Sequence, residues 1–242
     1  MTTRKRADVL LVERGLFDSR TRAQAAIAAG LVTADGVVLR KASESISADA
    51  RLQASDHPWV SRGALKLIAA LDHFGFDPSG RVCLDVGAST GGFTEVLLAR
   101  GARHVYAIDV GRDQLHARLR GDPRITSLEE TDIRTLDPAR LIEPPDVATV
   151  DVSFISLKLV LPALGALLRR PAQLVALIKP QFEAGRAHLK KGIVRDPAVH
   201  AAVCDDIVAF AASVGWDVAG VVPSPIEGGD GNKEFLLAAR MH

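Results

Sequence analysis

The sequence has few cysteines, no long apolar run and almost no net charge. Its two cysteines, Cys83 and Cys204, lie in apolar stretches without a CxxC pair, which argues against a disulfide framework and a cysteine metal site. The longest apolar run, residues 157–168, is interrupted by Lys158 and Pro162 and is too short to cross a bilayer. The first residues show no secretory signal, so we expect a cytoplasmic protein without stable membrane association.

The net charge of +1 neither favours nor excludes a nucleic-acid partner, but the basic residues are unevenly distributed. Up to Lys41 there are eight basic and four acidic residues, a balance that suits phosphate contacts and equally a solvated helix face. A second basic segment follows residue 185. The candidate RNA-binding residues are Arg4, Lys5, Arg6, Arg14, Arg20, Arg22, Lys41, Arg62, Arg186, Lys190 and Lys191.

The first fifty residues read as a small α+β domain. Helical spacing over residues 7–14 ends at Gly15, and Ser19 is a suitable N-cap for a second helix that ends near Gly30. Two short β-type runs then flank Asp35-Gly36, a tight-turn signal. We therefore predict a helix–helix–hairpin domain over residues 1–54 and a linker over residues 55–60.

Residues 61–242 alternate between helical and strand patterns. This alternation predicts an α/β fold with a mostly parallel sheet and helices on both faces. The predicted strands number seven, and their sequences are RVCLDVG, HVYAIDV, RITSL, VATVDV, QLVALIK, WDVAGVV and EFLLAAR.

A glycine-rich segment, LDVGASTGGF, follows the first of these strands and opens a helix. Glycines allow a sharp turn close to a ligand, and a carboxylate at the end of the next strand can hold the hydroxyls of a ribose. The pattern predicts an adenosine-type cofactor at the carboxyl edge of the sheet. The candidate cofactor-binding residues are Asp85, Gly87, Ala88, Ser89, Thr90, Gly91, Gly92, Phe93, Asp109, Asp132 and Asp151.

A dinucleotide is the obvious rival to this cofactor. Its fingerprint is GxGxxG, whereas this chain has GxxxGG, and Asp85 before the first glycine suits a cationic amine. An amino-acid moiety carries such an amine and a pyrophosphate does not. We therefore favour S-adenosyl-L-methionine, while a glycine-rich turn without any ligand remains the plain structural alternative.

Four charged residues follow or precede buried apolar segments of the same domain. Asp151 and Lys179 end adjacent predicted strands, Lys66 lies in the helix that leads into the sheet, and Glu234 opens the last strand. Singly, each is most simply a solvated charge. Together, a lysine flanked by carboxylates has the composition of a proton-transfer site.

The chain resembles the TlyA family, often labelled hemolysin, whose catalytic domain is similar to the FtsJ ribose 2'-O-methyltransferases. The resemblance rests on RADVLLVERGLFDSRTRAQAAIAAGLV, WVSRGALKL, VCLDVGASTGGFTEVLL, VDVSFISLKLVLPAL, LVALIKPQFEAGR and SPIEGGDGNKEFLL, among others. The first stretch also resembles the RNA-binding module of a small-subunit ribosomal protein. The chain departs from the family pattern in two places: Ala64 replaces a glycine, and Arg112-Asp113 replaces a glycine and an aromatic residue.

The resemblance implies a Rossmann-like class I methyltransferase with a catalytic tetrad of Lys66, Asp151, Lys179 and Glu234. It implies transfer of a methyl group from S-adenosylmethionine to a ribose 2'-hydroxyl of ribosomal RNA, free or in assembled subunits, without a metal. Lys179 would help to remove the hydroxyl proton. Two alternatives stay open: an RNA-binding protein with a non-catalytic methyltransferase fold, and a membrane-active hemolysin.

Overall fold

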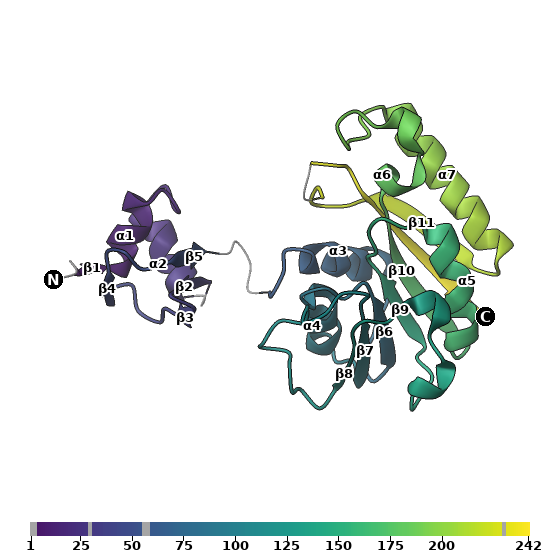
Figure 1. Ribbon diagram of the computed structural model, residues 1–242, viewed down its shortest axis with the longest axis horizontal. Helices are drawn as coiled ribbons and strands as arrows, with labels where there is room; N and C mark the ends of the chain where they lie inside the picture. The colour runs from purple at the N-terminus through teal and green to yellow at the C-terminus, as the bar shows by residue number, and fades with distance from the viewer. Residues whose placement is uncertain (1–3, 29–30, 55–58, 229–230) are drawn as a thin grey trace. The chain divides into compact units, whose positions relative to one another are not determined.

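The computed structural model describes residues 4–28, 31–54, 59–228 and 231–242, apart from the side chains of Ala25, Ala28 and Arg186. The chain divides into two compact units, Met1–Trp59 and Val60–His242 (Figure 1). Most of the expected linker, namely residues 55–58, lies outside the described residues. So does Gly30, the expected end of the second helix.

The smaller unit contains two short helices and two small antiparallel sheets. The predicted helix–helix–hairpin order is confirmed, and the hairpin turns at Asp35 and Gly36, which both have positive φ. Three further strands were not predicted, because a segment of three residues is too short to establish a strand period. The elements are β1 (Arg4–Arg6), α1 (Ala7–Glu13), α2 (Arg20–Ala28), β2 (Val32–Ala34), β3 (Val37–Val38), β4 (Ser45–Ser47) and β5 (Leu52–Ala54), with sheets β1-β4 and β3-β2-β5.

A fully buried carboxylate joins the two helices of this unit. Asp8 on α1 accepts hydrogen bonds from Arg6 at 3.0 and 3.1 Å and from Arg20 and Gln24 of α2 at 2.8 Å. The Arg6 guanidinium holds the pKa of Asp8 well below its usual range. Because a buried charge is costly unless it is paired, these donors determine how α1 meets α2.

Replacing Asp8 with Asn is expected to destabilise the smaller unit by about 2–3 kcal/mol, since it removes a charged acceptor from two arginines. Thermal unfolding at neutral pH measures the loss. Asp18→Asn is the matched control, because Asp18 pairs with Arg22 at the surface, and its effect should stay within about 0.5 kcal/mol. Equal effects of the two substitutions would contradict this account.

The larger unit is built on the predicted sheet of seven strands. Their order is β11-β12-β10-β9-β6-β7-β8, and only β12 runs antiparallel to its neighbours. The strands are β6 (Val82–Val86), β7 (His104–Ile108), β8 (Ile125–Leu128), β9 (Val147–Val150), β10 (Ala172–Ile178), β11 (Asp217–Pro223) and β12 (Phe235–Met241). The mostly parallel α/β fold is therefore confirmed.

Helices cover both faces of this sheet, with α3 and α4 on one side and α5 and α7 on the other (Figure 1). None of the helices in the described ranges is long and apolar enough to cross a membrane. The helices are α3 (Ala64–Phe74), α4 (Gly92–Ala99), α5 (Leu157–Leu167), α6 (Pro180–Glu183) and α7 (Pro197–Ser213), with short 3₁₀ helices η1 (Ile133–Thr135), η2 (Pro138–Arg140) and η3 (Arg186–His188).

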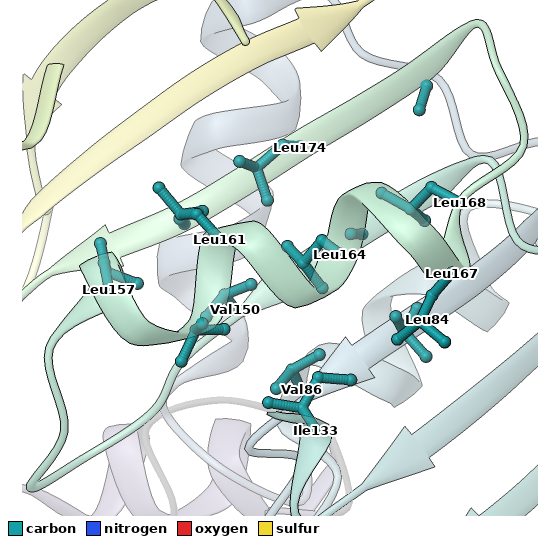
Figure 2. Packing of buried hydrophobic residues seen from close by; sticks show 14 of the residues in the cluster. Leu84, Val86, Ile133, Val150, Leu157, Leu161, Leu164, Leu167, Leu168 and Leu174 are labelled. Carbon is teal, nitrogen blue, oxygen red and sulfur yellow. The ribbon is translucent and has the colours of Figure 1, made fainter. Parts of the chain in front are cut away.

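The main hydrophobic core lies between the sheet and the layer formed by α5 and α7. Figure 2 shows leucines of α5, among them Leu161 and Leu164, directed toward Val150 of β9, Leu84 of β6 and Leu174 of β10. These side chains are almost completely buried. This packing holds the parallel strands in position. Because the strands are parallel, the loops following β6, β7, β8, β9 and β10 meet at one edge of the sheet.

Candidate active site

The glycine turn after β6 approaches the end of β9 more closely than any side chain would allow. Gly87 has φ of 81°, and a Cβ atom placed there would lie 2.6 Å from the carbonyl oxygen of Asp151. Gly91 has φ of 93°, and its Cβ would lie 2.4 Å from a methyl group of Leu119. Both positions therefore favour glycine for its conformation, and Gly87 also for its size, because there the opposing atoms belong to the backbone.

Asp109 lies beside this turn at the end of β7. Its Oδ2 accepts a hydrogen bond from the Ser89 N–H at 2.8 Å, and its Oδ1 accepts one from the Gly111 N–H at 2.7 Å. A carboxylate has about four acceptor sites, so capacity remains for two hydroxyl groups. Asp109 thus lies where a ribose-binding carboxylate is expected.

A cavity of about 550 Å³ opens between these loops at the carboxyl edge of the sheet. It is lined by the segments that follow β6, β7, β8 and β9, including Gly87, Ser89, Asp109, Asp132 and Asp151. The Asp132 carboxylate also caps η1 and pairs with Arg134 at 2.6 Å, so the cavity wall here carries an ion pair and not a free acid.

The structure places Asp85 differently from our expectation. Its side chain is completely buried and lines neither this cavity nor the neighbouring one. Thr94 and Thr149 donate hydrogen bonds to its two oxygens at 2.7 and 2.9 Å, and burial raises the pKa of Asp85 to about 6. In this structure the two threonine hydroxyls, from α4 and β9, occupy the carboxylate, so the assignment of Asp85 to a cofactor amine stays a prediction.

A second cavity of about 310 Å³ adjoins the first and shares Gly87, Ser89, Asp151 and Ser153 with it. Lys66 and Lys179 line it, and so do four glycine-turn residues that we assigned to the cofactor. These are Ala88, Thr90, Gly92 and Phe93, whereas Gly91 lines neither cavity. The glycine turn is therefore the common wall of two adjoining spaces.

The four charged residues expected at this edge form two buried ion pairs. The Lys66 ammonium lies 2.5 Å from Glu234, and the Lys179 ammonium lies 2.6 Å from Asp151. Lys179 and Glu234 are brought together because β10 and β12 pair in register, Ile178 opposite Phe235. Their side chains are at most 20% exposed, so both pairs are shielded from solvent.

Sequence reasoning missed Ser153, whose Oγ accepts a hydrogen bond from Lys179 at 3.0 Å. Its position two residues after Asp151 was the available signal. It also missed Val110, Gln114 and Arg134, which line the larger cavity.

Most basic residues of the smaller unit have partners within that unit. Arg6 and Arg20 hold Asp8, Lys5 pairs with Glu13 at 2.6 Å, and Arg22 pairs with Asp18 at 2.8 Å. Arg4 bonds to Ser45, and Arg14 donates to backbone carbonyls of residues 48 and 50. Their side chains remain largely exposed, as does Lys41, so these residues are structural and still present positive charge.

The basic candidates of the larger unit lie near the second cavity or on an exposed turn. Arg62 lines the cavity. Lys190 and Lys191 are exposed on a turn closed by the Lys190–Ile193 bridge. The side chain of Arg186 lies outside the described part of the structure.

Within the described part of the structure, no three His, Cys, Asp or Glu side chains are grouped so as to hold a metal ion.

The fold and the edge site together define a Rossmann-like protein of the class I methyltransferase type. In such a protein the last strand, here β12, lies antiparallel between two strands of an otherwise parallel sheet, and a glycine turn follows β6, the central one of the five parallel strands β10-β9-β6-β7-β8. Comparison of the sequence with known protein families gives the same class. Residues 59–241 match the FtsJ-like methyltransferase family, and residues 5–52 match the S4 domain.

Similar proteins show which methyltransferase family the chain belongs to. The chain is 46% identical to the 16S/23S rRNA (cytidine-2'-O)-methyltransferase TlyA of Mycobacterium tuberculosis, over 99% of this chain and 91% of TlyA. It is 37% identical to Hemolysin A of Brachyspira hyodysenteriae, over 96% and 98%. A solved structure described as a hemolysin from Streptococcus thermophilus has TM-score 0.76 and 43% identity, over 100% and 90%. The chain belongs to the TlyA family of S4-containing, FtsJ-like methyltransferases.

Replacing Gly87 with Ala is expected to lower the affinity for S-adenosylmethionine at least about tenfold, because the new methyl group would displace the backbone of Asp151. Calorimetric titration measures the affinity. Gly121→Ala is the control, since Gly121 also has positive φ, +88°, but a Cβ atom placed there would meet nothing within 4 Å. An affinity equal to that of the control variant would contradict the steric argument.

Proposed function

We propose that this protein transfers a methyl group from S-adenosylmethionine to a ribose 2'-hydroxyl of ribosomal RNA, in the cytoplasm where ribosomal subunits are found. The observation that carries the proposal is the pair of buried lysine–carboxylate contacts at the smaller cavity: both lysines line it, and Asp151 lies on the wall that it shares with the larger cavity. The name of the TlyA relative, an rRNA cytidine-2'-O-methyltransferase, supports the same reaction and substrate class.

The larger cavity fits the cofactor. Its glycine turn admits a close ligand at Gly87, Asp109 retains acceptor sites for ribose hydroxyls, and apolar side chains such as Ile133 and Ile155 suit a flat aromatic base. When bound, S-adenosylmethionine supplies an electrophilic methyl group on a positively charged sulfur. The smaller cavity is then left for the acceptor nucleotide.

In this proposal Lys179 acts on the acceptor hydroxyl. Its ammonium contacts Asp151 and Ser153, which hold the side chain toward the shared wall of the cavities. The Asp151 carboxylate would take the hydroxyl proton, because the charged ammonium has no acceptor site, and Lys179 would stabilise the negative charge that develops on the hydroxyl oxygen. The bound cofactor would supply the methyl group and leave as a neutral thioether. Lys66, which Glu234 holds through their ion pair, lines the acceptor space as well, so that much of the rate comes from orientation.

Two surfaces suit the RNA itself. The smaller unit, matched to the S4 domain, presents exposed basic side chains, and the turn with Lys190 and Lys191 presents two more on the larger unit. Phosphate contacts of this kind provide affinity without reading sequence. Residues 1–54 therefore contribute RNA affinity in this proposal, and residues 61–242 contribute the chemistry.

Replacing Lys179 with Ala is expected to reduce methyl transfer to ribosomal subunits by at least about 100-fold, because the acceptor hydroxyl loses the ammonium that orients it and stabilises its developing negative charge. Cofactor affinity should change little, since Lys179 does not line the larger cavity. The assay follows labelled methyl groups from cofactor to RNA. Lys158→Ala, which removes a lysine paired with Asp206 at the surface, should keep wild-type turnover. A folded Lys179→Ala protein with the wild-type rate would refute the tetrad.

Replacing Lys190 and Lys191 together with Ala should weaken RNA binding and make it less dependent on salt. Each lost phosphate contact should reduce the slope of log K against log salt by roughly 0.7–0.9. Filter binding over a series of salt concentrations gives the slope, and thermal unfolding checks that stability is unchanged, as expected for exposed side chains. An unchanged slope would show that this turn does not contact RNA.

A further inference from the structure

The loop after β7 forms one wall of the larger cavity. Val110 and Gln114 of this loop line the cavity, and Val110 is 73% exposed, so the loop is not held there by its own burial. The loop also carries Arg112 and Asp113, which form one of the two departures from the family pattern. Asp113 has φ of 53°, a conformation that a side chain disfavours and that persists only if neighbours enforce it.

One carboxylate holds the peptide groups of this loop. Glu129, directly after β8, accepts hydrogen bonds from three consecutive backbone N–H groups: Asp113 at 2.5 Å, Gln114 at 2.8 Å and Leu115 at 3.0 Å. Consecutive N–H groups that converge in this way form an anion-binding nest. These hydrogen bonds lower the pKa of Glu129, with the largest contribution from the Leu115 N–H. The carboxylate is therefore charged at neutral pH.

Two carbonyl groups of the same loop accept hydrogen bonds from an arginine. Arg120 donates hydrogen bonds to the carbonyl oxygens of Leu115 at 2.6 Å and Asp113 at 3.0 Å. The loop continues to His116, whose N–H donates to the carbonyl of Thr90 in the glycine turn at 3.1 Å. Glu129 therefore fixes a segment that connects the wall of the cavity to its glycine turn.

We propose that Glu129 is a positioning residue for the cofactor, acting through the loop 110–115 and without touching the cofactor itself. This proposal rests on the proposed function, because it assigns the larger cavity to S-adenosylmethionine. Glu129 lines neither of the two adjoining cavities, and the loop lines only the larger one. Its loss should therefore affect cofactor binding and leave the acceptor site and the chemical step unchanged.

The test compares Glu129→Ala and Glu129→Gln with the wild-type full chain, using calorimetry with S-adenosylmethionine and methyl transfer to ribosomal subunits. Glu129→Ala should raise the Kd and the KM for the cofactor at least about tenfold, the equivalent of one lost charge-assisted hydrogen bond. Glu129→Gln should show a smaller increase, because its amide oxygen still accepts. The kcat at saturating cofactor and the KM for RNA should stay within about twofold.

Glu130→Gln is the matched control, since it removes the same charge from the adjacent residue, and it should keep wild-type constants. Three results decide between the hypotheses. A wild-type protein that binds no S-adenosylmethionine overturns the proposed function. Wild-type binding with an unchanged Glu129→Ala affinity overturns only the role of Glu129. If kcat falls as much as KM rises, or if Glu130→Gln has a similar effect, the substitution damages the fold in general. That result also overturns the role of Glu129.

Discussion

The close contact between Gly87 and the backbone of Asp151 is the constraint on which the site depends. It joins the turn after β6 to the end of β9, and the two cavities share a wall at this contact. A methyl donor on one side and an acceptor on the other would meet there with few atoms between them. The buried strands beneath, held by the leucines of α5, supply the rigidity that such a geometry requires.

Buried charge is used in three different ways in this protein. Asp8 is surrounded by two guanidinium groups and an amide and acts as a structural centre of the smaller unit. Asp85 accepts hydrogen bonds from the hydroxyls of Thr94 and Thr149, but burial outweighs them and raises its pKa to about 6. Lys66, Asp151, Lys179 and Glu234 form two ion pairs. The first three of them line the smaller cavity, whereas Asp8 and Asp85 line neither of the two adjoining cavities.

The fold and the meeting of Asp151 with Lys179 were predictable because they follow simple periodic rules. Parallel strands place their carboxyl ends at one edge, so an acid or a lysine after a buried apolar run must lie there, as Asp109, Asp151 and Lys179 do. The direction of Asp85 was not predictable, since a one-residue shift along a strand reverses the face. The partners of Arg6 and Arg20 depend on how α1 meets α2, and Glu129 binds backbone groups that leave no mark in the sequence.

The chemical identity of the methylated product tests the central claim most directly. Ribosomal subunits from cells lacking this protein would be treated with purified protein and isotopically labelled S-adenosylmethionine, and the RNA digested to nucleosides for mass spectrometry. The account predicts that the label appears in a 2'-O-methylnucleoside, with the methyl group on the sugar fragment. Label on a base fragment, or no label in RNA from either subunit, would contradict it.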